Sequence, residues 1–135
     1  MERIETTAIR NLIHNEEYCR KVLPFIKEEY FTDRLEKLIF TQIYEFVNKY
    51  NNLPTKESLS IEMNSNKSVS EDEYKRMNEI ISSLNPEPIN LDWLVETTEV
   101  WCKDRAIHNA ILGGIQILDG KDKDHTPEYL PEMLS

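Results

Sequence analysis

The chain has 135 residues, of which 39% are hydrophobic and 30% are charged, as is ordinary for a soluble globular domain. Its formal net charge of −9 repels phosphate groups, which argues against a segment that binds DNA or RNA unaided. The sequence contains no apolar run long enough to span a membrane, and its 3 glycines argue against a turn-rich β fold.

Two isolated cysteines, Cys19 and Cys102, lack the spacing of metal ligands. Both occupy apolar helical positions, which favours free buried thiols over a disulfide and is typical of a cytoplasmic protein. The three histidines are equally scattered, so no metal site is predicted.

Apolar residues recur every three or four positions through the first half of the chain, the pattern of amphipathic helices. Two short helices are predicted, one over residues 4–13 and one from Glu16, where Pro24 is either tolerated or ends the helix early. A third predicted helix begins after Thr32 or Asp33 and ends at Asn51. We assign the core to residues of this third helix and to one tryptophan further along: Leu35, Leu38, Ile39, Ile43, Phe46 and Trp101.

A shorter helix is predicted over residues 56–63, followed by a polar loop. Ser70 and Glu73 then form a capping-box pattern that starts a fifth helix. Residues 86–90 contain Pro86 and Pro88, which exclude a helix there. The sequence therefore predicts a helical bundle over residues 1–85, a proline-containing linker over 86–90, and a separate segment over 91–135.

The last segment opens with a predicted helix of about 28 residues, capped by Asn90 and ending before Gly120. The helix carries two apolar stripes, whereas a surface helix of a monomer needs only one. One stripe is formed by Leu91, Leu94, Val95, Trp101 and Cys102, and the other by Trp93, Val100, Ile107, Ile111 and Leu118. The residues alone leave two interpretations open: a central core helix, or a helix held between its own domain and a second helix or chain.

A second arm is expected to start at Thr126–Pro127 and to bring an apolar face, of which only about two turns are present. The segment 91–135 is therefore interpreted as a helical hairpin with a truncated second arm. No catalytic pattern accompanies it. Gly113, Gly114 and Gly120 cannot build a phosphate-binding loop, and the aspartates near Gly120 lack the spacing of a calcium loop.

Several stretches resemble the N-terminal domain of DnaB-type replicative DNA helicases, most nearly the T-even-phage branch. They are residues 21–31 (KVLPFIKEEYF), 34–40 (RLEKLIF), 53–55 (LPT), 93–99 (WLVETTE) and 105–110 (RAIHNA), in the expected order. The resemblance extends from Ile4 to about Leu134. One departure is the polar run 64–68, where bacterial members usually have a connection rich in Gly and Ala.

The resemblance implies an all-α collar domain without activity of its own, which assembles helicase subunits and docks primase. Hairpins would pair between subunits as a trimer of dimers, which favours the interface interpretation of the second stripe. ATP and Mg²⁺ would be used only by a motor domain beyond Ser135, so no cofactor is expected within these residues. The alternative is a stand-alone acidic helical adaptor without enzymatic activity.

The net charge generates a first prediction. Because the chain has no cluster of Lys or Arg to displace counterions, it should show no appreciable affinity for single- or double-stranded DNA at physiological salt. Fluorescence anisotropy with labelled oligonucleotides measures this, and micromolar affinity would contradict the prediction.

Overall fold

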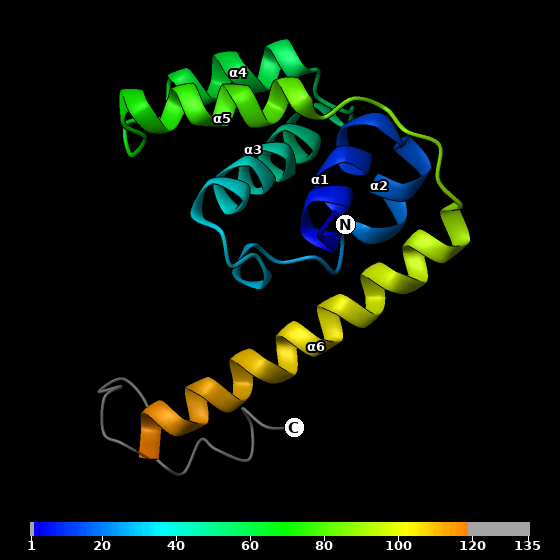
Figure 1. The fold of residues 1–135 in the computed structure, drawn as a ribbon, viewed down its shortest axis with the longest axis vertical. Helices are drawn as coiled ribbons and strands as arrows, with labels where there is room; N and C mark the ends of the chain where they lie inside the picture. The colour runs from blue at the N-terminus through cyan, green and yellow to red at the C-terminus, as the bar shows by residue number, and fades with distance from the viewer. Residues whose placement is uncertain (1, 119–135) are drawn as a thin grey trace. The chain divides into compact units, whose positions relative to one another are not determined.

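The computed structural model describes residues 2–118, with side chains up to Ile115, and this part of the chain is helical throughout apart from its connections. The predicted all-α fold is confirmed (Figure 1). The elements in chain order are α1 (Ile4–His14), α2 (Glu16–Val22), the 3-10 helix η1 (Glu28–Tyr30), α3 (Arg34–Tyr50), α4 (Lys56–Asn64), α5 (Glu71–Ser83) and α6 (Leu91–Leu118).

The chain divides by spatial contact into two units, residues 1–98 and residues 99–135. The first unit contains five helices, η1 and the first two turns of α6, and the second contains the rest of α6. This division falls inside α6, whereas the sequence suggested the proline-containing linker, because Leu94 and Thr98 are fully buried. The second arm expected over residues 126–135 lies outside the described residues. No helix in the described part is both long and apolar enough to cross a membrane.

The first turns of the bundle follow from local signals. Asn15 separates α1 from α2, and its side-chain oxygen accepts a hydrogen bond from the Tyr18 amide. Helix α2 ends at Val22, two residues before Pro24, because proline has no amide hydrogen to continue the helical hydrogen bonds, although Leu23 itself keeps helical backbone angles. The chain then turns through η1 and buries Phe31, whose ring stacks on that of Phe40 at a centroid distance of 4.9 Å.

Helix α3 lies at the centre of this unit and contacts α1, α4, α5 and η1. The Asp33 side chain caps its start, and Asn51 ends it in the left-handed conformation with φ 50°. Four of the six residues assigned to the core are buried, namely Leu35, Ile39 and Ile43 on this helix and Trp101 on α6.

The other two core residues assigned from the sequence, Leu38 and Phe46, are only half-buried. Leu38 lies at the edge of the buried face, which extends instead over Glu36 and Phe40. Phe46 lies near the end of α3, where its ring packs on that of Tyr50 at 4.7 Å. The apolar pattern therefore located the buried face of α3 but misplaced one of its borders.

The carboxylate of Glu36 belongs to the buried face of α3. Glu36 is 4% exposed, and Arg3 Nη2 and Thr6 Oγ1 donate hydrogen bonds to its two oxygens at 2.6 and 2.9 Å. A charged group is tolerated in such a place only when it is paired and hydrogen-bonded. The side chains of Arg3 and Thr6 thus attach the N-terminal segment to α3.

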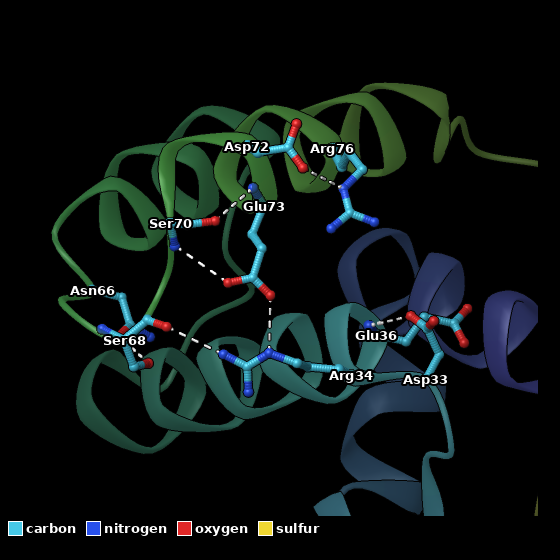
Figure 2. Close-up of polar contacts among 9 residues, drawn as sticks. All are labelled: Asp33, Arg34, Glu36, Asn66, Ser68, Ser70, Asp72, Glu73 and Arg76. Atoms are coloured by element: carbon cyan, nitrogen blue, oxygen red, sulfur yellow. Dashed lines mark hydrogen bonds and ion pairs between the residues drawn. The ribbon is translucent and has the colours of Figure 1, made fainter.

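Helices α4 and α5 form a hairpin against α3 (Figure 1). The predicted capping box is present: Ser70 Oγ accepts a hydrogen bond from Glu73 N, and Glu73 Oε1 accepts one from Ser70 N. Figure 2 shows Arg34 extending this motif, since its Nε donates to Glu73 Oε2 at 2.9 Å and its Nη2 to the Ser68 carbonyl at 3.1 Å. One arginine therefore ties α3 to the α4–α5 loop and to the start of α5.

This cluster generates a prediction about acid sensitivity. The hydrogen bond from Arg34, together with that from the Ser70 amide, lowers the pKa of Glu73 from its usual 4.5. Because the folded-state pKa is the lower one, the stabilisation is present above the unfolded value and is lost as the pH falls through the folded value. Glu73→Gln should therefore destabilise the domain at neutral pH and reduce the loss of stability on acidification, as measured by thermal unfolding between about pH 7 and pH 3.

Glu71→Gln is the matched control, since it removes the same charge from the same helical turn. If both variants changed the pH dependence equally, the general charge near the helix N-terminus would explain the effect and the Arg34 contact would not.

Candidate protein interface on helix α6

The long helix begins where the sequence predicted, and it extends to Leu118, the last residue that the structure describes. Asn90 Oδ1 accepts a hydrogen bond from Trp93 N at 2.9 Å, and the helix runs without interruption for 28 residues to Leu118. At about 100° per residue, its two predicted stripes lie on different faces.

One face of α6 is buried. Leu94 and Thr98 are fully buried, and Trp101 and Cys102 are 8% and 6% exposed. Leu91 and Val95, which the sequence assigned to the same stripe, are half-buried. Thr98 is the polar member of this face, and the apolar pattern did not reveal it.

A buried hydrogen bond fixes the position of Thr98 in the first unit. Thr98 Oγ1 donates its proton to the Leu94 carbonyl at 2.7 Å, so the Tyr18 hydroxyl must be the donor in the 2.7 Å contact between the two side chains. Both residues are fully buried. The contact therefore links α2 to the first two turns of α6 in a place where an unpaired hydroxyl would be costly.

The other stripe is exposed to solvent. Trp93, Val100, Ile107 and Ile111 are 54%, 59%, 60% and 48% exposed. At about 100° per residue, these four residues lie within about 40° of one another around the helix. The fifth predicted interface residue, Leu118, is the last residue of α6, and its side chain lies outside the described part. We call Trp93, Val100, Ile107 and Ile111 the outer stripe.

One further apolar side chain widens the surface around the outer stripe towards the end of α6. Ile115 is 48% exposed and lies about 40° from Ile111 around the helix, and it was not assigned to the interface from the sequence. Leu112 is 45% exposed but lies about 100° from Ile111, at the same angle as the buried Leu94. Ile115 follows Ile111 by four residues, the spacing that defines a helical face, so the sequence did contain a signal for it. Exposed apolar residues grouped on one face are typical of a protein contact surface, whereas isolated ones are ordinary.

The described residues offer little for catalysis. Burial raises the pKa of Cys19 to about 11 and that of Cys102 to about 12, so both thiols are protonated at neutral pH and poorly nucleophilic. Within residues 2–118, no three His, Cys, Asp or Glu residues lie close enough to hold a metal ion. A surface hollow of about 330 Å³ between α2 and α3 is lined partly by Cys19 and Tyr44, and its two charged residues, Glu16 and Arg20, pair with each other.

Comparison with known proteins identifies a relative of this chain. No family model matches the chain. A DnaB-like replicative helicase of Enterobacteria phage T4 is 34% identical to it over 109 residues, or 81% of this chain. The chain is related to the DnaB-like replicative helicases.

The relationship confirms the resemblance found in the sequence and supports a role connected with replicative helicases. The matched region makes up only 23% of the T4 protein, a share consistent with the predicted N-terminal domain. This relative of the helicases carries an exposed apolar surface on α6. Its described residues include no group of side chains placed to bind a metal ion.

The buried hydroxyl pair generates a prediction. Tyr18→Phe and Thr98→Val should each destabilise the domain, because each removes one partner of a buried hydrogen bond. The double variant should lose less stability than the sum of the two, by about 1 kcal/mol, in chemical unfolding.

Thr97→Val serves as the control because Thr97 is the neighbouring threonine and is only half-buried. Its effect should add to that of Tyr18→Phe. Strict additivity for Thr98→Val as well would show that the Tyr18–Thr98 contact carries no coupling energy.

Proposed function

We propose that this chain is the N-terminal assembly domain of a hexameric replicative DNA helicase. Its part would be to bring helicase subunits together, through pairing of the outer stripe of α6 with the same stripe of a second copy. The observation that carries the proposal is the exposure of Trp93, Val100, Ile107 and Ile111 on one face of α6, while Leu94 and Thr98 on another face are buried.

The energetics of such a surface favour association. Each large apolar side chain transferred from water into an interface contributes about 1.5–3 kcal/mol. In a two-fold pair each residue is used twice, so four residues per chain supply a substantial driving force even after the cost of association is subtracted. The relationship to DnaB-like helicases supports a second copy of the same chain as the occupant of the surface.

The rest of the parent protein's activity is proposed to lie in other residues. The sequence has no phosphate-binding loop, so ATP hydrolysis, Mg²⁺ binding and DNA unwinding are assigned to a motor domain in the remainder of the parent chain. Docking of primase is proposed as a second role of the domain. It is supported only by the helicase relationship, and no described surface is assigned to it.

Substitutions on α6 test the assembly role. Ile107→Asp or Ile111→Asp should shift the chain towards monomer, because each places two carboxylates in a two-fold apolar contact. Sedimentation equilibrium over a range of concentrations should show dissociation constants raised at least about a hundredfold, from roughly 3 kcal/mol or more of lost association energy. Circular dichroism should show the helical content retained, since both residues are exposed.

Ile43→Asp is the contrasting variant. Ile43 is fully buried in the centre of α3, so an aspartate there should unfold the first unit. If Ile107→Asp unfolded the chain as completely as Ile43→Asp, or left its association unchanged, the outer stripe would not be the interface.

A further inference from the structure

An exposed carboxylate, that of Asp104, lies at the edge of the outer stripe. At about 100° per residue, Asp104 lies about 40° from Val100 and about 20° from Ile111 around the helix, and between Val100 and Ile107 along the helix axis. Asp104 is exposed, and it forms no ion pair with any described residue. A surface that covers Val100, Ile111 and Ile115 therefore also covers this carboxylate, because Asp104 lies between Ile111 and Ile115 around the helix.

A second copy of α6 offers few cations to neutralise it. The exposed charged residues of the helix are mostly acidic: Asp92, Glu96, Glu99 and Asp104, against the single exposed lysine, Lys103. Lys103 lies about 100° away from Asp104 around the helix, and Arg105 is half-buried. The whole chain carries a net charge of −9, so two copies approach against a general repulsion as well.

We propose that Asp104 is the residue that limits self-association along α6 and keeps it weak and reversible. This inference rests on the proposed pairing of the outer stripes. In a two-fold contact both copies bring an Asp104, so two carboxylates lose water near each other without an assigned cation. A charged residue beside an apolar helical seam influences which helices pair along it. Here it restrains a surface that would otherwise bind other apolar faces indiscriminately.

The proposal predicts that removing the charge strengthens association. Asp104→Asn should lower the dissociation constant of the pair about tenfold in sedimentation equilibrium at low salt. Raising the ionic strength should strengthen the wild type more than the variant, because salt screens the repulsion that the variant no longer has. Both proteins should show the same helical circular dichroism, since Asp104 is exposed and makes no ion pair within the described residues.

Glu99→Gln is the matched control. It removes the same charge from the same helix at an exposed position, but it points about 140° away from Asp104. Its effect should be less than about twofold. Equal strengthening by both variants would mean that total charge opposes association, and weaker association of Asp104→Asn would mean that a cation of the second copy binds Asp104. Either result overturns the proposal.

The two levels of inference fail differently. If Ile107→Asp weakens association while Asp104→Asn does not strengthen it, the interface stands and the role given to Asp104 is wrong. If neither substitution alters association, the outer stripe is not the interface, and both proposals fall.

Discussion

The burial of Leu94 and Thr98 is the constraint that holds the start of α6 in the first unit. Both residues pack the first turns of α6 into the helical bundle. The hydrogen bond between Tyr18 and Thr98 makes this contact more specific than apolar packing alone, because a hydrogen bond requires a defined geometry. Because an α-helix has a fixed angular repeat, burying one face of the first two turns of α6 leaves exposed another face of these turns, which carries Trp93.

Polar contacts also join separate segments of the chain elsewhere in the first unit. The carboxylate of Glu36 is accepted into the interior because Arg3 and Thr6 supply its hydrogen bonds. Arg34 joins α3 to the loop before α5 through Glu73 and the Ser68 carbonyl. In each case a side chain ties together segments that are distant in the sequence, which gives a small bundle specificity that its modest apolar core would not provide by itself.

The described part of the chain carries an exposed apolar stripe on α6. Its buried thiols are held in the protonated state, and the ion pairs of Arg3 with Glu36 and of Arg34 with Glu73 serve helix attachment and capping. The chain is related to the DnaB-like replicative helicases, and the outer stripe of α6 is the surface for which we propose a subunit contact. The exposed charged residues of α6 are mostly acidic, and in the proposed pairing of two copies they would oppose the apolar attraction.

Most of the helical architecture was determined by the sequence itself. The ends of α3, α5 and α6 follow from Asp33, Asn51, Ser70 and Asn90, since capping depends on hydrogen bonds between residues only a few positions apart. The two stripes of α6 were likewise visible, because helical periodicity is a local property. The pattern could not show which stripe is buried, because Leu94 and Trp93 are both apolar and each fits a helical repeat.

Tertiary structure decided that question, together with the borders of the core. Leu38 and Phe46 fit the apolar repeat of α3 but are half-buried, while Glu36 is buried although it is charged. The difference arises because burial depends on partners such as Arg3, Thr6 and Tyr18, which lie tens of residues away along the chain and whose proximity no local pattern records. Spacing along a helix fixes the direction in which a side chain points, and only the packed fold determines what it meets there.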